Sequence, residues 1–185
     1  MTTSDQELIQ NILARDDRAF EKLLKRYLKP VYNFIYQLTN DSSVIDDLTQ
    51  ETFIKVWKNL RRFDKSKNFK VWLFAIAKNT AYDFLKKKKT VPFSYYTDGE
   101  GNNKLTNISD GQAQPQELAI KNDLARAIDK KLKKMPVHYR SILILRYKED
   151  FSLQEIALIL KKPYNTIKSQ HQRALSYFKK NLPLD

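Results

Sequence analysis

The sequence has no cysteine, only two histidines and only three glycines among its 185 residues. Without cysteine the chain has no disulfide, no thiolate metal site and no cysteine nucleophile. The absence of cysteine is compatible with a cytoplasmic location. The two histidines, His138 and His171, lie in different predicted helices, and neither has an acidic residue at metal-ligand spacing. All three glycines fall within residues 99–111, and their spacing does not match a glycine-rich phosphate-binding loop. The sequence therefore predicts no bound metal, no cofactor and no enzyme activity.

Long apolar runs are also lacking. No segment approaches the length of a membrane span. The first residues lack the basic-then-apolar order of a signal peptide. We therefore expect a soluble, cytoplasmic protein without membrane insertion.

Positive charge is abundant and unevenly placed, since 34 Lys and Arg stand against 21 Asp and Glu, a net charge of +13. Residues 1–95 carry +7, residues 96–117 carry −3 and residues 118–185 carry +9. Two basic blocks around an acidic spacer suit a polyanion contacted at two places, and such binding weakens as salt rises. Because many basic proteins bind no nucleic acid, the net charge favours nucleic-acid binding but does not establish it.

Helical periodicity runs through both basic blocks, and the absence of a strand pattern predicts an all-α fold. Ser4 and Glu7 predict the cap of a first helix, and Asp16 and Asp17 that of a second, which Pro30 should kink or interrupt. A third and a fourth helix follow, with Trp57 expected in the core of the third.

Periodicity is lost from about residue 91 to residue 116, which predicts a linker. We therefore expect two helical domains, residues 1–92 and 118–185, joined by a flexible linker over residues 93–117.

Residues 152–175 predict two helices joined by a tight break. Ser152 and Glu155 form a capping box, and Pro163 ends the first helix. In a helix-turn-helix the second helix enters the DNA major groove. An ordinary helical hairpin with a solvated outer face is the alternative. The candidate contact residues share one polar face of the second helix: Asn165, Lys168, Ser169, Gln172 and Arg173.

Two further segments carry candidate binding groups. One face of the third helix bears acidic and amide residues, including Asp46. This face is either solvated or a docking surface for a basic partner helix. Residues 68–86 mix aromatic, amide and basic groups, and such a mix suits single-stranded DNA. Helical spacing also places Phe69 and Trp72 in a core.

Taken in order, these segments resemble the extracytoplasmic-function sigma factors of bacterial RNA polymerase, in the sigma-70 family. The likeness covers nearly the whole chain outside the linker. It rests on residues 19–27 (AFEKLLKRY), 46–57 (DDLTQETFIKVW), 69–85 (FKVWLFAIAKNTAYDFL), 132–136 (LKKMP) and 140–147 (RSILILRY).

The resemblance implies a region 2 helical bundle and a region 4 helix-turn-helix, which bind core RNA polymerase and direct it to promoter DNA. It implies contacts to the β′ clamp helices and the β flap, and an anti-sigma factor as regulatory partner. By residue, it implies polymerase binding by Asp47, Gln50, Glu51 and Lys55; minus-ten contacts by Asn68, Phe69, Lys70, Asn79, Asp83 and Lys86; and minus-thirty-five contacts by Asn165, Lys168, Ser169, Gln172 and Arg173.

The chain departs from the family pattern around the turn. Lys161 stands where glycine is usual, and a left-handed residue there would cost roughly 1 kcal/mol. Gln170 and His171 replace residue types common in the family, which predicts a modest change in minus-thirty-five preference. Two other functions remain open: a stand-alone helix-turn-helix regulator, and an interaction module that only holds a regulatory partner.

Overall fold

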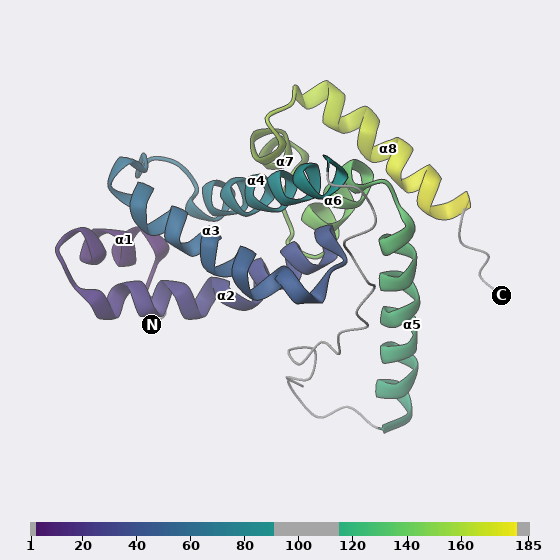
Figure 1. The fold of residues 1–185 in the computed structure, drawn as a ribbon, viewed down its shortest axis with the longest axis horizontal. Helices are drawn as coiled ribbons and strands as arrows, with labels where there is room; N and C mark the ends of the chain where they lie inside the picture. The colour runs from purple at the N-terminus through teal and green to yellow at the C-terminus, as the bar shows by residue number, and fades with distance from the viewer. Residues whose placement is uncertain (1–2, 91–114, 181–185) are drawn as a thin grey trace.

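The computed structural model describes residues 3–90 and 115–180, and every regular element within them is helical (Figure 1). The all-α prediction is confirmed. Most of the expected linker lies outside the described residues, and the helix that follows begins at Pro115, inside its predicted end. The elements are α1 (Asp5–Leu13), α2 (Asp17–Thr39), η1 (Ser42–Val44), α3 (Ile45–Asn59), η2 (Leu60–Arg62), α4 (Phe69–Thr90), α5 (Pro115–Lys134), α6 (Val137–Tyr147), α7 (Leu153–Leu160) and α8 (Tyr164–Lys180).

The helices begin where the sequence places their caps. The Ser4 hydroxyl accepts from the Glu7 N–H at 3.2 Å, and the Asp16 carboxylate accepts from the Arg18 N–H at 3.0 Å. At α7 both halves of the capping box form: the Glu155 N–H donates to Ser152 Oγ at 3.2 Å, and the Ser152 N–H donates to Glu155 Oε2 at 2.9 Å. Each cap satisfies an N–H group that the first helical turn leaves free.

Pro30 does not interrupt α2, which continues from Asp17 to Thr39. A proline inside a helix costs about 3 kcal/mol, because a hydrogen bond is lost and the ring crowds the preceding turn. Burying one large apolar side chain stabilises the fold by about 1.5–3 kcal/mol. Around Pro30, α2 buries Tyr27, Val31, Phe34 and Ile35, and together these outweigh the proline.

The first half of the chain packs α1, α3 and α4 around α2. Phe34 of α2 and Phe74 of α4 are fully buried, with ring centroids 5.2 Å apart. The expectation that Trp57 belongs to the core is wrong, since its side chain is 50% exposed. Val56 takes the inward position instead, and the next residue along a helix points about 100° away from it.

In the second half, α6 forms the centre and α7 and α8 pack on it. Ile142, Ile144 and Leu145 of α6 are buried, and Ile167 and Ala174 of α8 are fully buried. This packing turns the polar face of α8 outward.

The two halves also pack against each other. The helix α7 contacts α4, while α5 and α6 contact α2 (Figure 1). The Phe151 ring, 2% exposed, meets Phe74 edge-on at 5.1 Å. The Arg140 guanidinium donates to the carbonyl of Leu38 at 2.7 Å and to that of Lys133 at 2.9 Å. One contiguous apolar cluster therefore spans both halves.

Candidate nucleic-acid and partner interfaces

The outer face of α8 brings together all five residues predicted for the duplex contact. Asn165, Lys168, Gln172 and Arg173 are exposed. Ser169 is half-buried and donates to the Thr166 carbonyl at 3.0 Å. The helix lies on the outer side of the second half, away from α2 and α3 (Figure 1). The face is therefore open to a DNA groove without rearrangement.

The turn before α8 contains the left-handed residue that the sequence suggested. Lys161 has φ 52° and ψ 50°. The Lys162 N–H donates to the Ala157 carbonyl at 3.0 Å, and the Lys161 N–H donates to the Leu158 carbonyl at 3.3 Å. These two bonds form a Schellman motif, in which glycine is the usual left-handed residue.

The two unusual residues of α8 have structural partners. Gln170 Oε1 accepts from Lys162 Nζ at 3.2 Å, which ties the turn to α8. His171 Nε2 lies 3.1 Å from the Tyr147 hydroxyl, and the two rings stack. Burial, with Arg146 nearby, lowers the pKa of His171. His171 therefore packs on α6 rather than pointing outward.

The residues predicted for the minus-ten contact divide into covered and open groups. The Asn68 carboxamide accepts from the Val71 N–H at 3.3 Å and donates to Glu155 Oε1 at 3.3 Å. Lys70 donates to the Glu149 carbonyl at 2.5 Å and lies 4.6 Å from the Phe151 ring centroid. Both side chains thus contact the second half of the chain.

The other members of the set behave differently. Phe69 is 4% exposed and packs against Phe63 and Trp72, so its ring shapes the core and offers no free stacking surface. Asn79 is half-buried and accepts from Lys78 Nζ at 2.6 Å. The remaining two, Asp83 and Lys86, are exposed on α4.

A polar hollow of about 540 Å³ lies beside Asn68, between α1, α2 and the loop before α4. Arg26 pairs there with Asp5, whose other oxygen accepts from the Tyr27 hydroxyl. Burial and the Asp5 carboxylate raise the pKa of Tyr27. Donors and acceptors around a space of this size suit the edge of a nucleobase. The hollow was not predictable from the sequence, because its lining comes from three separate segments: Asp5, Gln6, Arg26, Tyr27, Ser66, Lys67, Asn68 and Phe69.

An apolar groove of about 420 Å³ separates α2 from α3. Leu28 and Ile54 are 42% and 45% exposed along it, and the buried Thr49 hydroxyl has no hydrogen-bond partner among the described residues. Exposed apolar side chains beside polar rim groups are typical of a protein docking surface. The lining is Phe20, Leu24, Leu28, Tyr32, Asp46, Thr49, Gln50, Phe53 and Ile54.

The predicted polymerase-binding residues divide around this groove. Gln50 lines it, with Asp46 beside it. Asp47 and Glu51 are exposed on α3 but do not line the groove. Lys55 pairs with Glu51 at 2.7 Å and donates to Thr80 at 3.1 Å, so it also ties α3 to α4. The apolar part of the groove was not predicted, although Leu28 and Ile54 fall outside the inward-facing positions of their helices and could have indicated it.

Within residues 3–90 and 115–180, no cluster of side chains is suited to hold a metal ion. None of the described helices is both long and apolar enough to cross a membrane.

Comparison with known proteins assigns the family. Residues 23–91 match the sigma-70 region 2 model, and residues 125–177 match the sigma-70 region 4 model. The chain is 31% identical over 179 residues to the ECF RNA polymerase sigma factor SigW of Bacillus subtilis, covering 94% of each chain. The chain belongs to the extracytoplasmic-function sigma factors. A second relative of this family, SigX of the same organism, is 27% identical over 91% of this chain and 86% of its own.

Two solved structures share the fold. CnrH in complex with the cytosolic domain of CnrY aligns with a TM-score of 0.67 at 21% identity, covering 95% of both chains. The sigma factor RpoE in complex with the anti-sigma factor NepR, from Bartonella quintana, aligns with a TM-score of 0.68 at 23% identity. That match covers 90% of this chain and 98% of RpoE.

Proposed function

We propose that this sigma factor binds core RNA polymerase, directs it to a subset of promoters and helps to open them. The observation that carries the proposal is the pair of separate polar surfaces, one in each sigma-70 region. The exposed face of α8 suits the minus-thirty-five element as duplex, through Asn165, Lys168, Ser169, Gln172 and Arg173. The segment from Asn68 to Lys86 suits the melted minus-ten strand.

Polymerase binding is assigned to the groove between α2 and α3. Gln50 supplies a polar group at the rim, with Asp47 and Glu51 near it on α3, while Leu28 and Ile54 supply apolar contact area. The partnerless Thr49 hydroxyl gains a hydrogen bond if a partner helix covers it. These features support docking on the β′ clamp helices, while the second half would meet the β flap.

The contacts of Asn68 and Lys70 give polymerase a further task. Both side chains bond to groups of the second half, Glu155 and the Glu149 carbonyl. A promoter strand reaches them only after α7 leaves α4. Polymerase would hold the two halves apart, and the free protein would bind minus-ten DNA weakly.

Regulation fits the same surfaces. An anti-sigma factor that covered the groove between α2 and α3 would exclude polymerase without touching α8. Because the proposed partners are polymerase and promoter DNA, we place the protein in the cytoplasm.

Run-off transcription from a library of random promoters, with purified bacterial core polymerase, tests the proposal. We expect initiation that depends on the protein at promoters sharing two spaced elements. Ile54→Arg should abolish both polymerase binding and initiation, because it puts a charge into the apolar groove. Glu21→Gln, an exposed change on α2 outside the groove, is the matched control.

The exposed α8 face also suits a stand-alone regulator, which would bind duplex operators without polymerase. Tight duplex binding by the free chain, with no polymerase binding, would replace the sigma function by that one. An interaction module would bind its regulatory partner, and transcription would not respond to Ile54→Arg.

A further inference from the structure

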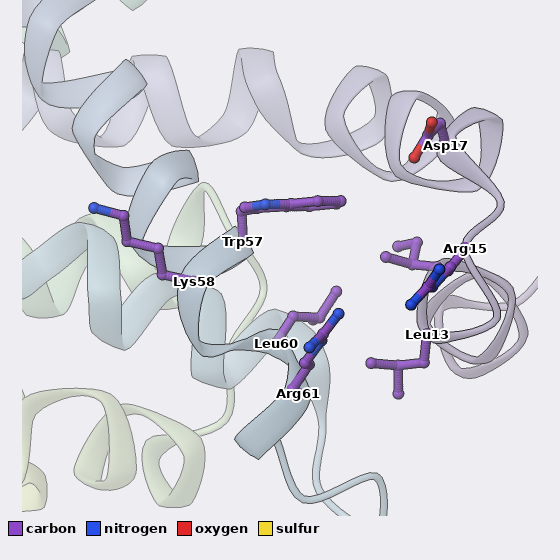
Figure 2. Close-up of a pocket in the computed structure, with 8 residues that line it drawn as sticks. Leu13, Arg15, Asp17, Trp57, Lys58, Leu60 and Arg61 are labelled. Carbon is purple, nitrogen blue, oxygen red and sulfur yellow. The ribbon is translucent and has the colours of Figure 1, made fainter.

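A second hollow, of about 530 Å³, lies between the C-terminal end of α1 and the end of α3 (Figure 2). None of the residues predicted for DNA or polymerase binding lines it. Its lining is Ile12, Leu13, Arg15, Asp17, Trp57, Lys58, Leu60 and Arg61.

Positive charge dominates this hollow. The guanidinium groups of Arg15 and Arg61 approach it from opposite sides, and Lys58 points away (Figure 2). Asp17 is the only acidic residue of the lining, and the structure gives neither arginine an ion pair with a described residue. Two guanidinium groups directed at one space repel each other, so an anion between them is favoured.

The backbone holds Arg15 in place by an unusual conformation. Arg15 has φ 68°, in the left-handed region that favours glycine. Its N–H donates to the Ile12 carbonyl at 3.0 Å, and the Asp16 N–H donates to the Asn11 carbonyl at 3.0 Å, which forms a Schellman motif at the end of α1. At this position arginine bears a steric cost that glycine would avoid.

Trp57 supplies an aromatic surface beside these cations. Its side chain is 50% exposed, and its ring meets Phe20 edge-on at 4.7 Å. The indole extends from α3 toward α1 (Figure 2). Proteins that bind single strands combine such an aromatic platform for a base with cations for the phosphate.

We propose that this hollow binds one nucleotide unit, with its base stacked on Trp57 and its phosphate between Arg15 and Arg61. We take the nucleotide to come from the promoter strand melted at the minus-ten element, and this part of the inference rests on the proposed function. The hollow beside Asn68 lies at the other end of α1. Nine helical residues span about 13 Å, the length of about four stacked nucleotides.

The first experiment measures holoenzyme binding to forked promoter templates. Their single-stranded non-template extension grows by one nucleotide at a time beyond the minus-ten element. We expect affinity to rise at least fivefold at one length, when a base reaches Trp57. An abasic nucleotide at that position should remove the gain.

Variants assign the gain to the hollow. Arg15→Asn removes the charge and keeps a residue that tolerates the left-handed conformation, and Arg61→Gln removes the facing charge. Both should lose the stepwise gain while binding the shorter templates like the wild type. Arg62→Gln, an exposed neighbour outside the hollow, should keep it. Thermal melting of each variant separates this loss from unfolding.

A second experiment tests whether the ligand of the hollow is the promoter strand or a free nucleotide, since both offer the same base and phosphate. AMP and ATP are titrated into the free protein while tryptophan fluorescence is followed, with Trp57→Leu as the reference for Trp72. Saturable quenching lost in Arg61→Gln, without a stepwise gain on templates, supports the site with a free nucleotide as its ligand. If both signals are absent while the wild type still supports transcription, the nucleotide site is contradicted and the proposed function is not. Absent transcription overturns the proposed function, and the nucleotide titration then decides the site alone.

Discussion

The two surfaces assigned to promoter DNA differ in what covers them. On α8, Lys168, Gln172 and Arg173 are exposed. Beside the start of α4, Asn68 and Lys70 bond to the second half. On the proposed function, duplex recognition would require no rearrangement, whereas capture of a melted strand would require the two halves to separate. One chain thus carries one surface ready for use and one that depends on an earlier step.

The interface that covers the second surface combines favourable and unfavourable contacts. Phe151 is buried against Phe74, which favours the closed arrangement. Lys78 is buried in α4, and its pKa is lowered by burial and then by the nearby Lys161 and Lys162. Like charges gathered at an interface oppose closure. The interface is therefore suited to open when a partner competes for either half.

Phe151→Ala should have the largest effect, because it should uncover the surface beside α4 and leave the exposed surface of α8 as it is. Removing a buried phenylalanine costs about 3–5 kcal/mol of unfolding free energy, from lost burial and the cavity left behind. It also removes the ring contact between Phe151, which lies just before α7, and Phe74 of α4. We expect a lower urea midpoint and stronger binding of a single-stranded minus-ten oligonucleotide by the free protein.

Leu158→Ala is the control for this change, because Leu158 lies nearby on α7 and is 67% exposed. It should alter stability by less than about 0.5 kcal/mol. Equal effects of the two substitutions would mean that the contact between the halves is not what covers Asn68 and Lys70.

Glu149 should make closure depend on pH. Its pKa is raised from 4.5 to about 7, mainly by burial, with Lys70 opposing the rise, Asp150 adding to it and Lys148 opposing it. Because the folded-state pKa lies above that of the unfolded chain, the favourable contribution is complete below about pH 4.5 and is lost as pH rises through about 7. The loss amounts to about 3 kcal/mol at most.

Opening can be followed between pH 5 and 8 with fluorophores on two introduced cysteines, Lys65→Cys and Gln154→Cys, since the natural chain has none. We expect the labels to separate as pH rises. Glu149→Gln should flatten this dependence, and an unchanged profile would exclude Glu149 as its cause.

Arg173→Ala tests the open surface by itself. Loss of one side chain that contacts a base edge reduces discrimination at that base pair by about 1–3 kcal/mol. We expect altered preference among minus-thirty-five variants in run-off transcription, with no change in the fluorophore separation. Lys179→Ala, at an exposed site in the last turn of α8, should leave preference unchanged. Unchanged promoter choice in Arg173→Ala would contradict the contact assignment.

Lys161→Gly should have the smallest effect. Glycine adopts the left-handed conformation without the steric cost that Lys161 bears, so stability should rise by roughly 1 kcal/mol or less. Thermal melting measures the change. A lower melting temperature would show that the lysine side chain contributes more than its backbone costs.

The sequence predicted local features well because local rules determine them. The caps at Ser4, Asp16 and Ser152 and the polar face of α8 follow from residue type and spacing along one helix. The left-handed Lys161 follows from its position in the turn. The family assignment came from the order of several such segments.

Contacts between distant segments were not predictable in this way. Asn68 and Glu155 are 87 positions apart, and no periodic pattern links them. The groove and both hollows also join separate helices, so their linings become visible only when the helices are packed. Trp57 shows the limit within one helix: Val56 and Trp57 are both apolar, and only the packing decides which one turns inward.

The two oxygens of Glu155 have separate partners. Oε2 accepts from the Ser152 N–H and completes the cap of α7, while Oε1 accepts from Asn68. On the proposed function, Asn68 would leave Glu155 for a promoter base, while the cap of α7 keeps its own oxygen. Separation of the two halves would therefore leave the first turn of α7 intact, and Glu155 Oε1 would bond to water instead.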